Sequence, residues 1–194
     1  MSPRILVVAA TPRELAVSPE WHAVLCGVGP VEAAAATAAA IAEYRPAAVL
    51  HVGIAGARRR CALAPAQLII GGASHYADSN VPEAWAPRVV TAGPAILAAM
   101  QHACPEALVR TIGTSARVGG TSDCDVEAME GFGVLRAAQR AGIPAIEVRA
   151  IANDIKEDDR ARWHFDAAFT AITGVTPRLV TALAAWLDTG AAHA

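Results

Sequence analysis

Short runs of apolar residues recur along the first half of the chain, and most of them end in glycine or in a polar turn. Four of these runs cover residues 5–10, 23–26, 47–52 and 67–70. A continuous apolar run of roughly four to eight residues followed by a turn is typical of a strand buried on both faces of a sheet. We therefore predict four strands here, with glycine-bearing loops after the second and the third.

Helical patterns fill several of the gaps between the predicted strands. An alanine-rich segment at residues 31–44 and an apolar segment at 94–104 predict helices, since alanine is the best helix former. Residues 126–133 open a third predicted helix. Gly142 can supply its left-handed end, and Pro144 stops its continuation.

The rest of the chain completes an alternating pattern. We predict further strands at 108–112 and 146–154, loops at 74–92 and 113–125, and two terminal helices at 158–172 and 177–187. Alternating strands and helices of this length predict an α/β fold in three layers (α/β/α), with a central mixed, mostly parallel sheet. At 194 residues, with no repeat or linker, residues 1–194 are expected to form a single domain.

The composition narrows the class of partner. Hydrophobic residues make up 54% of the chain and aromatic residues only 5%, so its apolar mass is mainly aliphatic, as in sheets covered by helices. The formal net charge is −2, without the basic excess that nucleic-acid binding needs. We therefore expect no nucleic-acid partner.

The cysteines and the apolar segments predict a cytoplasmic protein. The four cysteines form no closely spaced pair, so they suggest neither a disulfide framework nor a zinc site. The first apolar run is too short for a secretory signal, and no uninterrupted apolar segment is long enough to span a bilayer. We expect no membrane partner, no metal and no cofactor.

Polar residues near the third predicted helix mark a candidate site. Glu127 and Glu130 lie at its start, where the helix dipole stabilises carboxylates, and their spacing matches no calcium loop. The strand at 146–154 ends on an asparagine and an aspartate, and ligands of open α/β sheets bind at the carboxyl ends of strands. Arg149 lies within that strand, and Glu127 and Glu147 are its candidate partners.

The glycine-bearing turns allow other interpretations. Residues 27–32 contain half of a dinucleotide fingerprint, but Glu32 stands at the third glycine position, which argues against a nicotinamide dehydrogenase. Such turns bring backbone N–H groups close to a ligand or to a neighbouring turn. His51 lies inside a strand, so we interpret it as a core histidine. The arginines at 58–60 fit either an anion clamp or a solvated loop.

Several of these segments together resemble the nucleoside phosphorylase/nucleosidase superfamily. The resemblance extends over roughly residues 4–187, and the segments that carry it are 7–14, 26–34, 52–56, 126–131, 141–144 and 148–151. Any one of these segments alone occurs in many families, whereas their combination is specific to this superfamily. The resemblance implies a phosphorylase/hydrolase-like fold, a small-molecule purine nucleoside as the substrate, and a homo-oligomer.

Within that superfamily, three features are similar to the futalosine hydrolase family of menaquinone biosynthesis. The methionine–glutamate pair is followed by Gly131 rather than alanine. Ile54 stands where the methylthioadenosine nucleosidases usually carry a serine. Asn153 is followed by an arginine- and tryptophan-bearing segment at 158–163. This likeness implies hydrolysis of the N-ribosidic bond of futalosine, which releases hypoxanthine and dehypoxanthine futalosine.

The resemblance also implies roles for individual residues. Glu14 matches the glutamate that activates the attacking water in this superfamily. Glu130 would accept hydrogen bonds from the ribose hydroxyls, with Met129 packed under the sugar. Gly53 and Ile54 belong to the loop that borders the substrate.

Asn153 stands where nucleosidases that release adenine carry an aspartate. An amide offers both a donor and an acceptor, which suits a 6-oxopurine, so we expect hypoxanthine as the leaving group. Asp154 is a candidate for the acid role if the register shifts by one residue. That alternative keeps an adenine-releasing nucleosidase, acting on methylthioadenosine or aminodeoxyfutalosine, open.

The far end of the substrate also needs partners. Futalosine carries a benzoate, and Arg160, Arg58 and Arg117 are candidates to meet its carboxylate. Trp163 is a candidate to stack on the base or on the aromatic tail, and equally to pack against the terminal helix. The sequence does not choose among these arginines.

Two functions of other kinds stay open. A purine nucleoside phosphorylase would need cationic or hydroxyl groups around a phosphate. Arg13 offers a cation, but Ile54 offers no hydroxyl and Glu14 would repel the anion. A non-catalytic nucleoside-binding module is the second, and the polar residues at three expected strand ends argue against it.

Overall fold

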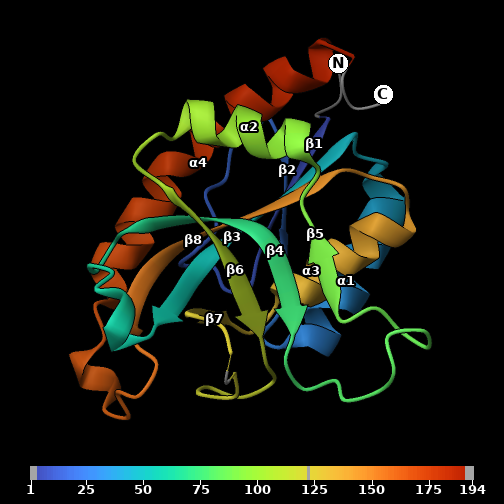
Figure 1. The fold of residues 1–194 in the computed structure, drawn as a ribbon. Helices are drawn as coiled ribbons and strands as arrows, with labels where there is room; N and C mark the ends of the chain where they lie inside the picture. The colour runs from blue at the N-terminus through green and yellow to red at the C-terminus, as the bar shows by residue number, and fades with distance from the viewer. Residues whose placement is uncertain (1–3, 122, 191–194) are drawn as a thin grey trace.

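The structure, a computed structural model, describes residues 4–121 and 123–190 (Figure 1). An eight-stranded sheet runs through this part of the chain. Its strands are β1 (Ile5–Ala9), β2 (His22–Leu25), β3 (Ala48–Ala57), β4 (Leu68–Tyr76), β5 (Val89–Thr91), β6 (Leu108–Thr114), β7 (Val126–Ala128) and β8 (Ala145–Asp154). The α-helices are α1 (Pro30–Tyr44), α2 (Pro94–Ala103), α3 (Gly131–Arg140) and α4 (Phe165–Asp188), with 3-10 turns at Arg59–Cys61 and Arg160–Arg162.

Most neighbouring strands run parallel. The order is β2-β1-β3-β7-β6-β4-β5, and β8 pairs with both β3 and β4. The antiparallel pairs are β3 with β7, β4 with β8 and β4 with β5. The predicted mixed, mostly parallel sheet is therefore confirmed. The pairing also closes β3, β8, β4, β6 and β7 into a ring, which apolar runs alone do not reveal because they predict strands and not their partners.

Helices cover the sheet on two sides, as the three-layer prediction requires (Figure 1). Helices α2 and α4 pack over one buried cluster, which includes Ile96 and Leu179, and α1 and α3 pack over another, which includes Ala33 and Leu135. Helices α1 and α3 approach closely: a Cβ at Gly133 would lie 2.4 Å from a backbone carbonyl of α1.

The helix predicted to open at residues 126–133 begins later than expected. Val126–Ala128 is strand β7, which is buried between β3 and β6, and the helix starts at Gly131. Glu127 therefore lies on a strand, where no helix dipole stabilises it. Glu130, directly before Gly131, keeps its predicted place at the helix start.

Three predicted loops contain strand residues. The glycine-bearing segment at 53–56 continues β3 in pairing with β8 and β7, because its small residues fit a two-sided, close-packed sheet. The predicted loop at 74–92 contains the end of β4 and all of β5. In the predicted loop at 113–125, strand β6 runs on to Thr114, and the described residues beyond it form no helix or strand.

The two predicted terminal helices form one helix. Helix α4 runs through Pro177, although proline removes one backbone hydrogen bond. The packing of Ile172, Leu179 and Leu183 against the sheet spans the proline and outweighs that loss. The first terminal helix was also predicted too early, since residues 158–164 form a loop with a short 3-10 turn.

Helix α4 also corrects the expectation about apolar segments. By length and composition alone it is apolar enough to cross a membrane, with a mean hydropathy of 1.3. Its apolar side chains pack on the sheet, which is the pattern of a core helix in a globular domain.

Candidate active site

A hollow of about 290 Å³ lies where β1, β3 and β8 end, at the edge predicted for a ligand. Loops and the first two turns of α4 complete its walls. Glu14, Glu130 and Asn153 all line it, although they lie far apart in the sequence. The residues that we predicted from the sequence and that line this hollow are Glu14, Ile54, Met129, Glu130, Asn153, Arg160 and Trp163.

Glu14 is fixed by a tight turn and by strand β3. One carboxylate oxygen accepts hydrogen bonds from the backbone N–H of Thr11 (2.9 Å) and from its hydroxyl (2.7 Å). The other oxygen accepts from the backbone N–H of Ile54 at 3.0 Å. The side chain is only 4% exposed. A buried carboxylate held at both oxygens keeps one orientation, as a base that must meet a bound water needs.

Glu130 is held between a glycine turn and a buried arginine. Its Oε1 accepts from the backbone N–H of Gly29 at 3.3 Å, and its Oε2 accepts from Arg149 at 3.2 Å. The glycine turn at 27–30 therefore brings a backbone N–H to the side chain of Glu130, a use that the sequence did not predict.

Arg149 links the buried charges of the site, and the sequence did not predict its contact with Glu130. The guanidinium is fully buried and touches a partner with each nitrogen: Nε donates to Glu147 (2.7 Å), Nη1 to the Ile54 carbonyl (3.3 Å) and Nη2 to Glu130, with His51 Nε2 at 2.5 Å from Nη2. Of its two predicted partners, Glu147 is confirmed and Glu127 is wrong. The signal that could have found the contact with Glu130 is an arginine inside an otherwise apolar strand, since a buried charge needs buried partners.

Burial and the surrounding charges shift the pKa values of Arg149 and His51. Burial alone would lower the pKa of Arg149, but the carboxylates of Glu147, Glu130 and Glu14 outweigh it and raise that pKa. Burial, together with the nearby Arg149 charge, holds the pKa of His51 well below its usual range. The neutral imidazole therefore donates from Nδ1 to the Val8 carbonyl (3.0 Å) and accepts from Arg149 at Nε2, which confirms it as a core histidine.

Glu127 anchors the loop that covers one side of the hollow. Its carboxylate accepts hydrogen bonds from the backbone N–H groups of Gly119 and Thr121 and from the Thr121 hydroxyl (2.6 Å). Val118 of this loop lines the hollow. Among the described residues, no group of three or more histidine, cysteine or acidic side chains could hold a metal ion.

An aromatic wall forms another part of the lining of this hollow. Trp163, Phe165 and Phe169 form a continuous row, with ring centroids 5.3 Å and 5.8 Å apart, and Arg160 lies over the Trp163 ring at 5.7 Å. The Trp163 indole N–H donates to a backbone carbonyl at 2.9 Å, which fixes the ring. This wall gives the hollow one apolar face, beside the polar face made by the carboxylates.

Comparisons with known proteins show the family of this chain. The model of the family "Phosphorylase superfamily" matches residues 18–118. A futalosine hydrolase from Streptomyces coelicolor is 32% identical over 199 residues, which cover 86% of this chain and 81% of that protein. The chain belongs to the phosphorylase superfamily.

Solved structures share the fold with this superfamily member. A methylthioadenosine/S-adenosylhomocysteine nucleosidase from Colwellia psychrerythraea, in complex with adenine, has a TM-score of 0.81 at 15% identity, covering 94% of this chain and 96% of that one. A futalosine hydrolase from Helicobacter pylori has a TM-score of 0.73 at 15% identity, covering 97% and 98%. The α/β architecture expected from the resemblance is therefore confirmed.

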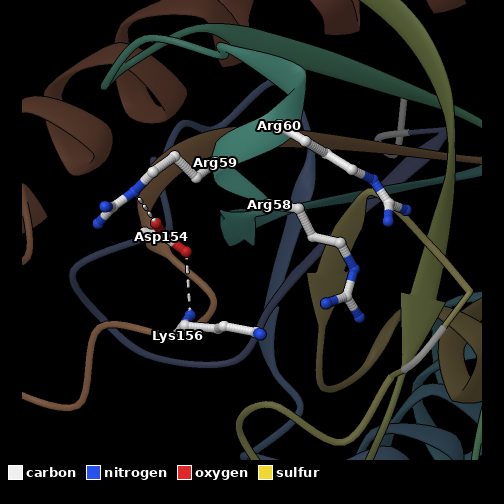
Figure 2. A pocket seen from close by; sticks show the side chains of 5 residues that line it. All are labelled: Arg58, Arg59, Arg60, Asp154 and Lys156. Carbon is white, nitrogen blue, oxygen red and sulfur yellow. Dashed lines mark hydrogen bonds and ion pairs between the residues drawn. The ribbon is translucent and has the colours of Figure 1, made fainter.

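Asp154, which we predicted as a substrate contact, does not line the hollow. Its carboxylate pairs with Arg59 (2.9 Å) and accepts from the backbone N–H of Lys156, and it lines a separate basic hollow of about 370 Å³ (Figure 2). Neighbouring residues of a strand point to opposite faces, so a strand that aims Asn153 into the first hollow aims Asp154 away from it. Asp154 therefore does not take the place of Asn153 in the first hollow.

Two of the three candidate arginines also lie elsewhere. Arg58 lines the basic hollow of Figure 2 and donates to the carbonyls of Cys124 (2.9 Å) and Thr121. Arg117 does not line the hollow of about 290 Å³, whereas Arg160 does.

Gly53, also predicted to border the substrate, lies behind the hollow, against Arg149. A Cβ at Gly53 would lie 2.2 Å from Arg149 Nη1 and 2.9 Å from Glu14 Oε1. Only glycine leaves room for the guanidinium and the carboxylate to approach the backbone of β3 together.

We predict that Gly53→Ala destabilises the protein and disables the site. The added methyl group must displace Arg149, which has no free space in a close-packed interior, so the free energy of unfolding should fall by ~1–3 kcal/mol. Chemical denaturation measures this change. Gly93→Ala is the control, since a Cβ there makes only an ordinary contact at 3.7 Å. Equal stability of the two variants would contradict the close approach at Gly53.

Proposed function

We propose that this chain hydrolyses the N-ribosidic bond of futalosine and releases hypoxanthine, as a step of menaquinone biosynthesis. The observation that carries the proposal is the convergence of Glu14, Glu130 and Asn153 on one hollow, in a chain 32% identical to a futalosine hydrolase. Glu14 activates the attacking water, Glu130 binds the ribose, and Asn153 contacts the base.

Breaking the bond between ribose and base builds positive charge on the sugar and negative charge on the base. A hydrolase therefore needs an oriented water on one side of the sugar and stabilisation of the leaving group on the other, by analogy with glycoside cleavage. Glu14, held at both oxygens, is the base that takes a proton from the water. Glu130 accepts hydrogen bonds from the ribose hydroxyls, and its negative charge favours the developing oxocarbenium ion. Met129 packs against the sugar.

The leaving group is matched to Asn153. The Asn153 Nδ2 donates to the backbone carbonyl of Asp154 at 2.9 Å, so Oδ1 is the acceptor available to a base N–H. As the C–N bond breaks and its electron pair moves to the base, N7 takes a proton from solvent, and only the N7–H so formed can donate to this acceptor. The acceptor therefore stabilises the departing base more than the intact nucleoside, which is the requirement for catalysis.

The aromatic wall fits the rest of futalosine. Trp163, Phe165 and Phe169 offer ring faces to an aromatic tail, and offset or tilted ring pairs are favourable. Arg160 lies at the Trp163 end of this wall and also lines the adjoining surface hollow, so its charge can meet the carboxylate of the benzoate.

Water is a better nucleophile for this site than phosphate. The backbone N–H of Ile54, which could have bound an anion, already donates to Glu14. Both buried carboxylates would repel a phosphate, and Arg149 is occupied by protein partners. These contacts support hydrolysis over phosphorolysis.

We expect futalosine to be the preferred substrate in a panel with aminodeoxyfutalosine, inosine and methylthioadenosine. Chromatography of the free base should show hypoxanthine from futalosine at a rate that phosphate does not change. Glu130→Gln should slow this release by ~10²-fold, the usual cost of losing one preorganised transition-state contact. Phosphate-dependent release would remove the water-activating role of Glu14, and full activity of Glu130→Gln would favour a binding module.

We expect Asn153→Asp to move the preference toward adenine nucleosides. A protonated aspartate donates to N7 of adenine, while an ionised one is repelled by the departing base. The ratio of adenine release from methylthioadenosine to hypoxanthine release from futalosine should rise by ~10-fold or more, in line with the cost of an unmatched polar contact. Steady-state assays with both substrates measure this ratio. An unchanged ratio would show that Asn153 does not read the base.

Residues 1–194 are proposed to form one nucleoside phosphorylase-like domain that acts in the cytoplasm as a homo-oligomer. Several large apolar side chains are left exposed in the single chain, among them Trp85 (79%), Val31 (74%) and Val28 (55%). Val28 lines the hollow, so a neighbouring subunit that covers it would also shape the site. Light scattering should give a multiple of the 20.0 kDa chain mass, and a 20.0 kDa species alone would contradict an oligomer.

A further inference from the structure

Glu147 is a buried carboxylate for which the proposed reaction has no direct use. It lies in the middle of β8, is 0% exposed and does not line the hollow. Its Oε1 accepts from Arg149 Nε at 2.7 Å, whereas its Oε2 has no partner within hydrogen-bond geometry among the described residues, although the Ser74 hydroxyl lies near enough to stabilise its charge. Burial raises the pKa of Glu147, and Arg149 opposes that rise. Because burying a carboxylate costs several kcal/mol, the presence of Glu147 in the core needs an explanation.

The start of α3 leaves space for this carboxylate. A Cβ at Gly131 would lie 2.3 Å from each Glu147 oxygen, so no other residue type fits at position 131 while Glu147 keeps its place. Gly131 directly follows Glu130. The backbone that carries the proposed ribose-binding carboxylate therefore lies directly against Glu147.

Arg149 connects Glu147 to the hollow. Its Nη2 reaches Glu130, which lines the hollow, while its Nε is bound by Glu147, which does not. In a low-dielectric interior, a guanidinium that turned toward the hollow would pair more closely with Glu130 and Glu14. It would then offset the negative charge that these carboxylates present to the sugar.

We propose that Glu147 is a positioning residue, which holds the Nε edge of Arg149 behind the hollow so that Arg149 orients Glu130 without neutralising it. This inference rests on the proposed function and adds a residue to it. Glu147 acts through Arg149 and touches neither the sugar nor the base.

The first test is Glu147→Gln, which keeps the shape and an acceptor oxygen and removes the charge. Charge-assisted hydrogen bonds are about twice as strong as neutral ones, so Arg149 should shift toward Glu130, and kcat for futalosine should fall by ~10-fold. KM should change by less than ~3-fold, because the hydrogen bonds of Glu130 to the ribose remain in the ground state. The matched control is Glu106→Gln, which removes a carboxylate from the exposed Glu106–Arg178 pair and should leave kcat unchanged.

A second variant reaches the same contact without changing any charge. Gly131→Ala should push the Glu147 carboxylate away from Arg149 and reproduce the selective loss of kcat, which also covers the case in which Glu147→Gln does not fold. A rise in KM as large as the fall in kcat would overturn the proposal. So would an unchanged kcat in both variants.

A readout without substrate separates this inference from the proposed function. The NMR signal of Arg149 Nε–H, assigned by its loss in Arg149→Lys, should exchange slowly with solvent in the unaltered protein and ~10-fold faster or more in Glu147→Gln, since its charged acceptor is gone. If the unaltered protein cleaves no nucleoside, the proposed function fails, and this exchange rate still decides whether Glu147 holds Arg149. Equal exchange in both proteins would overturn the inference even if futalosine is cleaved.

Discussion

The buried guanidinium of Arg149 is the constraint on which the other parts of the site depend. A cation without solvent must be paired and hydrogen-bonded, because the cost of removing its hydration is several kcal/mol, on the order of the stability of a whole domain. The chain meets this demand from three elements: Glu147 on the same strand, His51 on β3 and Glu130 before α3. Glu130, the proposed ribose-binding carboxylate, is therefore held by the same contacts that stabilise the core.

That constraint also explains the glycines that surround it. Gly53 leaves room for the guanidinium on β3, and Gly131 leaves room for Glu147 at the start of α3. Each glycine gives up the packing of a side chain so that a charged group can approach the backbone. The glycine after the methionine–glutamate pair, which the sequence offers as a mark of one family, is in physical terms the space that Glu147 occupies.

Local patterns predicted the strand ends well, and contacts between strands less well. Apolar runs placed Glu14 and Asn153 at carboxyl ends of strands, and parallel strands bring such ends to one edge, so their convergence followed from the pattern. The role of Arg149 did not follow, because its partners come from strands whose pairing the sequence does not specify. Glu127 was misplaced for the same reason: β7 is a strand only because β3 and β6 flank it.

The two sides of the hollow differ in how deeply they are built into the fold. The proposed sugar side consists of the buried carboxylates of Glu14, in the turn after β1, and Glu130, directly before α3, with the buried charge of Arg149 on β8 behind them. The proposed base and tail side consists of partly or fully exposed residues at the end of β8 and between β8 and α4, such as Asn153 and Arg160. Substitutions on the second side change few buried contacts, whereas substitutions on the first disturb a paired charge in the core. Under the proposed function, a fold of this design can change the base and the tail that it accepts while it keeps the chemistry at the sugar.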